Sequence, residues 1–341
     1  MGGNQERGYA VHFGASKKIS QMTNIVAITL NPSIDISTSV DRLTPLRKLR
    51  CAAPRVYPGG GGVNVARVAV RFGADVELIY PTGGATGQLL RRLVDREGIP
   101  NLAIDLKEET REDFTVLEEV TGAEYRFVLP GPQFMEAEWR QCLDTLTGLQ
   151  ARPDFIVGSG SLPPGVPVDF YARVARHAAK TGARFVLDTS GEALAAALHE
   201  GVFLVKPNLR ELHELMRFET EDDASLIDAS RRLIDGNHAE MVALTLGDLG
   251  ALLVTRDRAW RAHAPHVHMV SAVGAGDSFL GALLWALVSS HAMPEALRYG
   301  VAAGAAAVLS PGTALSDRDD VEKLRPAVRV EEVEERAGAW H

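Results

Sequence analysis

The stretch Ser271-Ala272-Val273-Gly274-Ala275-Gly276-Asp277-Ser278 runs directly into an apolar segment, Phe279 to Val288. Glycines at the start of a helix let backbone N–H groups face an anion. An acidic residue on the first turn of the same helix is out of place unless it has a chemical task. The stretch therefore favours a phosphate-transfer centre with Asp277 as its base. The alternative is a glycine-rich start to a buried helix that Asp277 merely caps.

The composition limits the classes of protein to consider. A chain of 341 residues, 46% of them hydrophobic, can bury a large core. Its net charge of -8 argues against general binding of nucleic acid or anionic membranes, so local Lys and Arg must hold any anionic ligand. Two cysteines, Cys51 and Cys142, fit a reducing cytoplasm, and no apolar run reaches the roughly 18 to 20 residues that span a bilayer. We expect a cytoplasmic protein with no nucleic-acid or membrane partner.

Apolar segments alternate with helical patterns along most of the chain. The segments that read as buried strands are Ile25–Leu30, Val76–Tyr80, Phe155–Gly158, Phe185–Asp188, Phe203–Val205 and Met241–Leu246. This order predicts an α/β fold whose mainly parallel sheet is covered by helices on both faces. We expect residues 1–23 to be a disordered extension, 24–330 to form one domain and 331–341 to be a tail.

Two further segments read as exposed β structure rather than core. The first lies at about 33–57 and the second at about 110–130, where Thr121-Gly122 separates the two strands of a hairpin. Together these segments would form one small sheet that acts as a lid.

Basic residues stand in both of these exposed segments. Lys48 and Arg50 are two positions apart, so on a strand they share a face and could grip one phosphate, with Arg111 entering from the second segment. The alternative is that they only protect an exposed sheet edge.

Four consecutive glycines occur in the run Pro58-Gly-Gly-Gly-Gly-Val-Asn64-Val-Ala66. Because four glycines are costly to order, they imply positive φ angles or backbone pressed close to a ligand. The run is not a dinucleotide fingerprint, since Asn64 or Val65 stands where G-x-G-x-x-G needs its third glycine, and no G-x-x-x-x-G-K-[ST] occurs. A nicotinamide dehydrogenase is therefore disfavoured.

Polar residues follow several of the predicted strands. Ligands of open α/β sheets bind at the carboxyl ends of strands, so Asp35 is a candidate to accept hydrogen bonds from substrate hydroxyls, or else forms an Asx turn. Ser161 lies in a rigid loop, Ser159–Gly165, that could offer hydroxyls or amides to a ligand.

A third strand end reads Lys206-Pro207-Asn208-Leu209-Arg210-Glu211. Asn208 and Glu211 are three apart at a helix start and share a face, and oxygen ligands so spaced suit Mg²⁺, directly or through water. A capping box made of Asn and Glu explains the same spacing equally well.

These residues resemble the ribokinase/PfkB family of sugar kinases over about 24–326. The run from Pro58 to Ala66 matches the N-terminal signature and Gly274-Ala-Gly-Asp277 the C-terminal one. Within the family the chain is similar to the 6-phosphofructokinase branch through Asn31-Pro-Ser-Ile-Asp35, Lys48-Leu-Arg50-Cys-Ala-Ala-Pro54, Gly83-Gly-Ala-Thr-Gly87, Gly158-Ser-Gly-Ser-Leu-Pro-Pro-Gly165 and Lys206-Pro-Asn208.

The resemblance implies a ribokinase-like three-layer α/β/α domain with a β lid that often pairs across a dimer. We therefore expect a homodimer through the lid sheet, with ATP and a sugar phosphate as substrates. The resemblance also implies that Asp277 is the base for a sugar hydroxyl and that Gly274, Ala275 and Gly276 form the anion hole.

The resemblance implies roles for the remaining candidates. The sugar would be held by Asp35, Gly60, Gly61 and Asn64, and its 6-phosphate by Lys48, Arg50 and Arg111. MgATP would lie against Lys206, Asn208, Glu211, Thr245 and Gly247, with Asn208 and Glu211 on the family's element for Mg²⁺. A loop for a monovalent cation, usually K⁺, would involve Ser271, Val273, Ala307, Ser310 and Gly312.

The activity so implied is ATP-dependent phosphorylation of the 1-hydroxyl of fructose 6-phosphate. Tagatose-6-phosphate and fructose-1-phosphate kinases, the alternatives within the family, commonly carry Lys where this chain has Gly61. A catalytically inactive sugar-phosphate sensor would have lost the base or the anion hole, and both are present. The chain departs from many members by having Ala272-Val273 before Gly274, and Ala314 where relatives can have a longer polar residue.

Overall fold

The computed structural model describes residues 24–150, 152–220, 222–310 and 312–333. The expected N-terminal extension, 1–23, and the end of the expected tail, 334–341, lie outside the described residues.

The larger of two sheets contains, within the described residues, ten strands in the order β14-β13-β12-β11-β10-β9-β8-β1-β4-β5. Its strands are β1 (Ile25–Ile28), β4 (Val76–Gly83), β5 (Asn101–Leu106), β8 (Phe155–Ser159), β9 (Arg184–Asp188), β10 (Val202–Val205), β11 (Ala239–Thr245), β12 (Ala251–Thr255), β13 (Ala259–His263) and β14 (Arg329–Glu332). The strands from β5 to β11 pair in parallel, and β11 to β14 pair antiparallel. This mainly parallel sheet confirms the predicted fold class.

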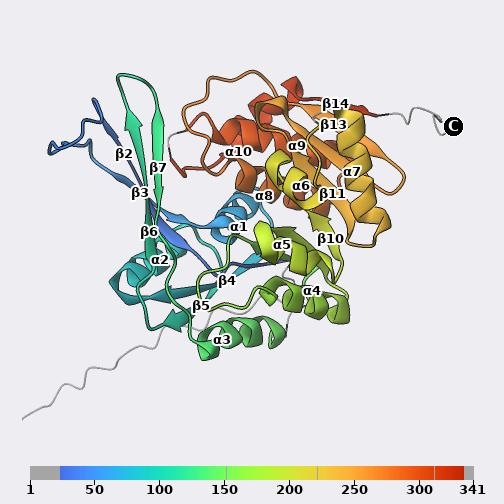
Figure 1. Cartoon of the computed structure of the whole chain (residues 1–341), viewed down its shortest axis with the longest axis horizontal. Coiled ribbons are helices and arrows are strands. Elements are labelled where there is room, and N and C mark those ends of the chain that lie inside the picture. The colour runs from blue at the N-terminus through green and yellow to red at the C-terminus, as the bar shows by residue number, and fades with distance from the viewer. Residues whose placement is uncertain (1–23, 151, 221, 311, 334–341) are drawn as a thin grey trace, which may run out of the picture.

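Helices cover both faces of this sheet and so form a three-layer structure (Figure 1). Their bounds are α1 (Gly61–Arg71), α2 (Gly84–Arg96), α3 (Glu136–Thr147), α4 (Phe170–Thr181), α5 (Gly191–Leu198), α6 (Leu209–Met216), α7 (Asp223–Asp235), α8 (Ala275–Val288), α9 (Met293–Ala307) and α10 (Arg318–Leu324), with short 3₁₀ turns η1 (Gly247–Leu249) and η2 (Arg325–Ala327). None of the helices in the described part of the chain has the length and apolar character that a bilayer span requires.

Strand β1 shows why the sheet is buried on both sides. All four of its residues are aliphatic and buried; Ile25 and Ala27 belong to one hydrophobic core, and Val26 and Ile28 to the other. Side chains of α1, α2, α8, α9 and α10 fill the first core, and side chains of α3 to α7 fill the second. The continuous apolar run thus marks a central strand, because its side chains alternate between two covered faces.

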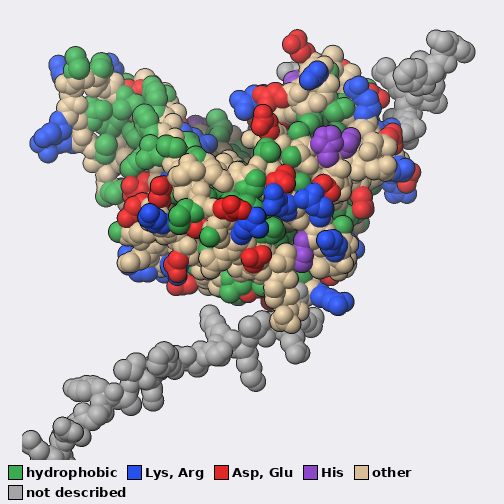
Figure 2. All heavy atoms as spheres, turned by 60° about the horizontal axis from the view of Figure 1, so that its bottom comes forward, with side chains coloured by type: hydrophobic (Ala, Val, Ile, Leu, Met, Phe, Trp, Pro, Cys, Tyr) green, Lys and Arg blue, Asp and Glu red, His purple; other side chains and the backbone are tan. Residues whose placement is uncertain are grey.

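The smaller sheet has the order β3-β2-β6-β7 and projects from the main body (Figure 1). Its strands are β2 (Ser33–Val40), β3 (Arg55–Gly59), β6 (Arg111–Glu118) and β7 (Glu124–Val128). β2 pairs with β6 in parallel, and the two outer pairs are antiparallel. The two segments predicted to form one small sheet therefore do so. Figure 2 shows hydrophobic side chains gathered on this projection.

The expected boundary between domain and tail, after residue 330, falls inside β14. Glu331 and Glu332 belong to β14, which pairs with β13 at the edge of the large sheet, and Glu331 forms an ion pair with His263 at 3.0 Å. The run of acidic residues reads as a solvated tail because an edge strand tolerates charges on its exposed side.

Helices α1 and α8 pack against each other through a glycine. A Cβ atom at Gly281 of α8 would lie 2.8 Å from Val68 Cβ and 2.9 Å from Val65 O of α1. Contacts this short require the backbones to separate. Gly281 therefore sets how closely the first turns of the two helices approach.

We expect Gly281→Ala to lower the free energy of unfolding by about 1 to 3 kcal/mol, because it overpacks the contact between α1 and α8. Gly304→Ala in α9 is the matched control, since its Cβ would meet ordinary contacts of 3.4 Å to Ala275 O and 3.8 Å to Phe279 Cβ. The control should leave stability unchanged or raise it by up to about 1 kcal/mol through helix propensity. Urea denaturation measures both, and equal effects would contradict the packing account.

Candidate active site

A pocket of about 280 Å³ lies where the small sheet meets the first turns of α1 and α8. Most of the predicted sugar-side and catalytic residues come together there, and the predicted residues that line it are Asp35, Gly60, Gly61, Asn64, Arg111, Val273, Gly274, Gly276 and Asp277. These residues are far apart in the chain, and the carboxyl ends of the parallel strands bring them to one edge of the sheet.

Asp277 lies on the first turn of α8, directly after a glycine turn. Gly274 is the N-cap residue with φ +76°, and a side chain there would overlap Leu315. The described residues of this turn show no side-chain capping bond. Instead, Asp277 Oδ2 accepts a hydrogen bond of 2.8 Å from Asn64 Nδ2. The geometry therefore departs from the capping alternative and leaves the carboxylate directed to the pocket.

The electrostatic surroundings of Asp277 raise its pKa to about 6. Burial is the largest cause, and the nearby Asp188 carboxylate adds to it. The hydrogen bond from Asn64 and the charge of Lys206 oppose the rise. A carboxylate whose pKa lies just below neutral pH is mainly ionised there and still a stronger base than an ordinary aspartate, as general-base chemistry requires.

Lys206 and Asp188 form a buried ion pair beneath the glycine turn. Lys206 Nζ lies 3.0 Å from Asp188 Oδ1, and a Cβ atom at Gly276 would lie 3.4 Å from the same Nζ. Burial opposes the charge of Lys206, but Asp188 outweighs it and the pKa of the lysine is raised. Asp188 was not predicted as a site residue, although it ends a predicted strand at the edge where ligands bind.

The glycine run is explained by close contacts on both sides. Gly60 has φ +98°; a Cβ atom at Gly59 would overlap the Asp35 carboxylate, and one at Gly61 would overlap Ser159 Oγ. Asp35 Oδ1 also accepts a hydrogen bond of 2.6 Å from Ser33 Oγ. The run lets β3 pass into α1 while Asp35 lies against it.

Two basic residues of the small sheet line the pocket. Arg111 of β6 was predicted there and forms an ion pair with Asp113 at 2.7 Å. Arg126 of β7 also lines the pocket and was not predicted. Its signal in the sequence was weak, because Arg on an exposed strand is usually a solvated residue.

The prediction that Lys48 and Arg50 share a strand face is wrong. Residues 41–54 form a connection between β2 and β3 that is not a strand, with a turn at 45–47 in which Leu46 has φ +59°. Both basic side chains are exposed and neither lines the pocket. Pro45 cannot donate a strand hydrogen bond and favours a turn, so the two-residue periodicity did not apply.

Ser161 also lies outside the pocket lining. Its side chain accepts a hydrogen bond of 3.0 Å from Asn31 Nδ2, and the residue is exposed. This contact fixes the loop after β8 to the end of β1.

Asn208 and Glu211 form a capping box, which was one of the two alternatives that the sequence allowed. Glu211 N donates to Asn208 Oδ1 at 2.9 Å, and Asn208 N donates to Glu211 Oε2 at 2.9 Å. Asn208 is bridged in parallel to Thr245 at the end of β11, and Gly247 follows with φ +62°. These four residues therefore lie together at the carboxyl ends of β10 and β11. Burial raises the pKa of Glu211 in spite of the Asn208 bond and Lys206.

The residues predicted for the cation loop lie on two adjacent segments. Ser271 N donates to Val308 O at 3.3 Å at the end of α9, where Ser310 N donates to Ala307 O. Val273 N donates to Ser271 Oγ at 3.2 Å. A Cβ atom at Gly312 would lie 2.6 Å from Ser37 Oγ, so the loop closes against β2.

A larger cavity of about 730 Å³ lies at the opposite end of the strands, where β9, β10 and β11 begin. None of the predicted site residues lines it. The smaller pocket, and not the larger one, holds Asp277, the glycine turn and the basic residues.

Comparison with known proteins agrees with this geometry. The pfkB family of carbohydrate kinases matches residues 22–320. ATP-dependent 6-phosphofructokinase isozyme 2 of Mycobacterium tuberculosis is 44% identical over 318 residues, which cover 93% of this chain and 94% of that protein.

Phosphofructokinase-2 of Escherichia coli is similar in structure. Its complex with fructose-6-phosphate has a TM-score of 0.84 at 38% identity and covers 90% of this chain and 99% of its own. Its complex with potassium has a TM-score of 0.85 at 39% identity and the same coverage. Its inhibited form is tetrameric, with a TM-score of 0.83, 39% identity and again the same coverage. The present chain belongs to the pfkB family of carbohydrate kinases.

Proposed function

We propose that this protein is an ATP-dependent 6-phosphofructokinase, which transfers the γ-phosphoryl group of ATP to the 1-hydroxyl of D-fructose 6-phosphate. The observation that carries the proposal is the position of Asp277, held at the first turn of α8 beside Gly274–Gly276, in one pocket with Asp35, Asn64 and Arg111. The relatives named as 6-phosphofructokinases support the same substrate.

In the proposed reaction Asp277 accepts the proton of the sugar 1-hydroxyl. The oxygen of that hydroxyl bonds to the γ-phosphorus of ATP, and the bond from this phosphorus to the leaving ADP breaks. Backbone N–H groups of the glycine turn and the dipole of α8 stabilise the charge that develops on the phosphoryl oxygens. Lys206 lies beneath the same turn and adds a fixed positive charge. Asp35 and Asn64 orient the sugar, and Arg111 with Arg126 binds its 6-phosphate.

Mg²⁺ bound with ATP would neutralise charge on the phosphates, and Asn208 and Glu211 would hold it, directly or through water. Their fit rests on the chemistry of the donors: a carboxylate and an amide oxygen are ligands that Mg²⁺ prefers, and the capping bonds use only one of the two Glu211 oxygens, Oε2. Thr245 and Gly247 would line the nucleotide side of the same edge.

We extend the proposal to K⁺ at the loop formed by Ser271, Val273, Ala307, Ser310 and Gly312. Hydroxyl and backbone carbonyl oxygens are suitable ligands for such a cation. Ser37 Oγ, which is buried beside Gly312 and has no hydrogen-bond partner among the described residues, is a further oxygen at this place. The potassium complex of the Escherichia coli relative supports the assignment.

The free thiols Cys51 and Cys142 favour a cytoplasmic location.

Gly61 favours fructose 6-phosphate over the substrates of the sister kinases. A side chain at this position would overlap Ser159 Oγ, so the Lys that those kinases commonly carry has no room in this arrangement. A sugar-phosphate sensor without catalysis is disfavoured because Asp277, Gly274 and Gly276 all line the pocket.

An ADP-release assay with fructose 6-phosphate, tagatose 6-phosphate, fructose 1-phosphate and fructose tests the proposal. We expect kcat/KM to be highest for fructose 6-phosphate, in line with the relatives named as 6-phosphofructokinases, and lowest for fructose, which has no phosphate for Arg111 and Arg126 to bind. Asp277→Asn supplies the background rate. Faster turnover of fructose 1-phosphate would move the chain to the 1-phosphofructokinases, and no turnover with any sugar would favour the sensor.

Asp277→Asn should lower kcat by at least about 10²-fold and at the same time stabilise the fold at neutral pH. The pKa of Asp277 is raised from 3.8 to about 6 in the folded protein, so its stabilising protonated form is lost as pH rises through about 6. At 1.36 kcal/mol per pKa unit the ionised carboxylate costs at most about 3 kcal/mol at pH 7.5, a cost that asparagine avoids.

Thermal unfolding at several pH values measures the stability effect. The variant should have the higher Tm at pH 7.5, and the difference should vanish below about pH 4, where the wild-type carboxyl is protonated in both states. The kcat of the wild type should fall below about pH 6. Near wild-type turnover by the variant would reject Asp277 as the base.

We also propose a homodimer through the small sheet. Several of its apolar side chains are exposed, namely Val120, Tyr125, Phe127, Val128 and Leu129, and the last four lie on or next to β7. An exposed apolar patch on a projecting sheet is typical of an interface.

Phe127→Glu should therefore convert a dimer into a monomer in light scattering, because it places a charge in the apolar patch. Glu136→Gln, on exposed α3 and away from this sheet, is the control and should leave the mass unchanged. A wild-type monomer, or a dimer that survives Phe127→Glu, would contradict this interface.

A further inference from the structure

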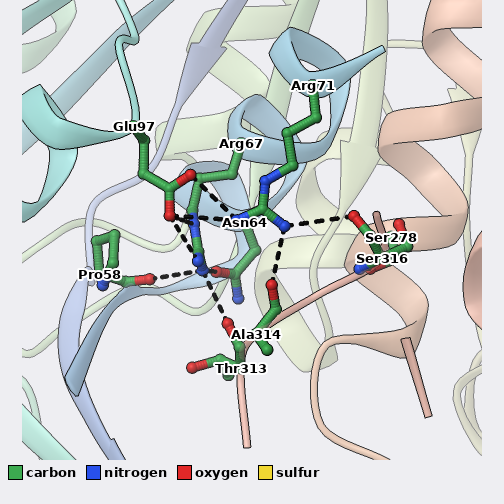
Figure 3. A network of polar contacts seen from close by, with 9 residues as sticks. All are labelled: Pro58, Asn64, Arg67, Arg71, Glu97, Ser278, Thr313, Ala314 and Ser316. Carbon is green, nitrogen blue, oxygen red and sulfur yellow. Dashed lines mark hydrogen bonds and ion pairs between the residues drawn. The ribbon is translucent and has the colours of Figure 1, made fainter. Parts of the chain in front are cut away.

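Behind Asn64 lies a buried polar network that the proposed mechanism does not use (Figure 3). Its centre is Arg67 on the second turn of α1, which is wholly buried and the largest side chain so enclosed among the described residues. A buried guanidinium is costly unless every donor direction has a partner. The positions of its partners therefore show what the residue does.

Arg67 is held first by Glu97, which follows α2. Nε donates to Glu97 Oε1 at 2.8 Å, and Nη2 lies 2.7 Å from the same oxygen. Burial opposes the charge of Glu97, but Arg67 and Arg71 outweigh it and its pKa is lowered. The positive charge of Arg67 is thus compensated locally.

The Nη1 group of Arg67 points to the active site. Nη1 donates to Pro58 O at 3.1 Å, to Thr313 O at 3.0 Å and to Asn64 Oδ1 at 3.2 Å. Pro58 precedes the glycine run, and Thr313 lines the pocket. One guanidinium therefore joins two walls of the pocket to Asn64.

The bond to Asn64 decides which way its amide group faces. A guanidinium is only a donor, so the amide must present Oδ1 to Arg67 and consequently Nδ2 to Asp277. The reversed amide would place two donors against each other on one side and, with an ionised Asp277, two acceptors on the other. We infer that Arg67, held by Glu97, is a positioning residue for the catalytic base, which fixes the Asn64 amide so that it can only donate to Asp277.

This inference rests on the proposed role of Asp277 as the base and adds a reason for its ionised state. A freely rotating amide can donate to the carboxylate or accept from the carboxylic acid, and so serves both protonation states. A fixed amide serves only the carboxylate and therefore lowers the pKa of Asp277. The charged groups facing Asp277 are Asp188 at the end of β9, Lys206 directly after β10 and Asp35 on β2.

The test is a titration of the Asp277 carboxyl carbon by ¹³C NMR, assigned with Asp277→Asn, which needs no substrate. Arg67→Met should raise the observed pKa by about one pH unit, because the freed Asn64 amide can then also accept a hydrogen bond from the protonated Asp277 and so stabilise the acid. Asn64→Ala should raise it by a similar amount. In the Asn64→Ala background Arg67→Met should add nothing further, because no amide remains to be positioned.

Arg71→Met is the matched control. Arg71 is one turn further along α1 and also binds Glu97, at 3.1 Å, but its other donor goes to Ala314 O and Ser316 O rather than to Asn64. The Arg71→Met variant should be less stable than the wild type but should leave the pKa of Asp277 unchanged. Arg67→Lys, which keeps the positive charge and an ammonium donor group, should show only part of the upward shift.

Three results would overturn the inference: no shift in Arg67→Met, the same shift in the Asn64→Ala background, which would indicate a direct charge effect, or an equal shift in Arg71→Met. If Arg67→Met does not fold, Arg67→Gln takes its place: its amide can accept as well as donate and so no longer fixes the Asn64 amide, the same upward shift is expected, and an unchanged titration there would equally overturn the inference. Failure of the proposed function appears separately, as absence of turnover by the wild type with an unaltered titration pattern.

Discussion

The hydrogen bond from Asn64 to Asp277 joins the first turns of two helices that are 213 positions apart in the chain. It can form only because α1 and α8 approach closely at Gly281, where even one methyl group would force them apart. Asn64 lies on the α1 side of the pocket, and the glycine turn before Asp277 leads into α8. The packing of Gly281 against Val65 and Val68 therefore holds these two sides of the pocket together.

Charges in and around this pocket are organised as pairs. Lys206 lies against Asp188, Arg111 against Asp113 and Arg67 against Glu97. Each pair avoids the large cost of an isolated buried charge. In a chain with net charge -8, local cations of this kind are what allows anionic substrates to bind. The pairs differ in position, because Arg111 lines the pocket, Lys206 lies beneath the glycine turn and Arg67 is enclosed.

The sequence was sufficient to predict the parallel sheet, because runs such as Ile25–Ile28 have no polar face that an exposed strand would need. It also placed Asp35, Asn64, Arg111 and Asp277 at one site, since each stands at a strand or helix end or in a motif of the family. The prediction that Lys48 and Arg50 share a strand face failed, because it extended strand periodicity across the turn at Pro45.

Other residues left no local signal. Arg67 stands in a helix among apolar neighbours, and Glu97 follows another helix like an ordinary surface charge, so only the tertiary contact 30 positions apart shows their function. Asn208 and Glu211 are a different case, because capping and metal binding use the same oxygen atoms at the same spacing. The fold satisfies the capping pattern, and that does not remove the oxygens from the edge where a nucleotide would lie.

The environment of Asp277 is a balance rather than a single effect. Burial and Asp188 favour the protonated form, while Lys206 and the amide of Asn64 favour the carboxylate, and the resulting pKa is about 6. Stronger stabilisation of the carboxylate would give a weak base, and weaker stabilisation would leave it protonated at neutral pH. A base of this kind needs a donor that cannot reverse its direction, because a reversible donor would stabilise both forms and shift the balance towards the acid. The buried Arg67 and Glu97 pair supplies that constraint from outside the pocket, where it does not compete with the substrate for space.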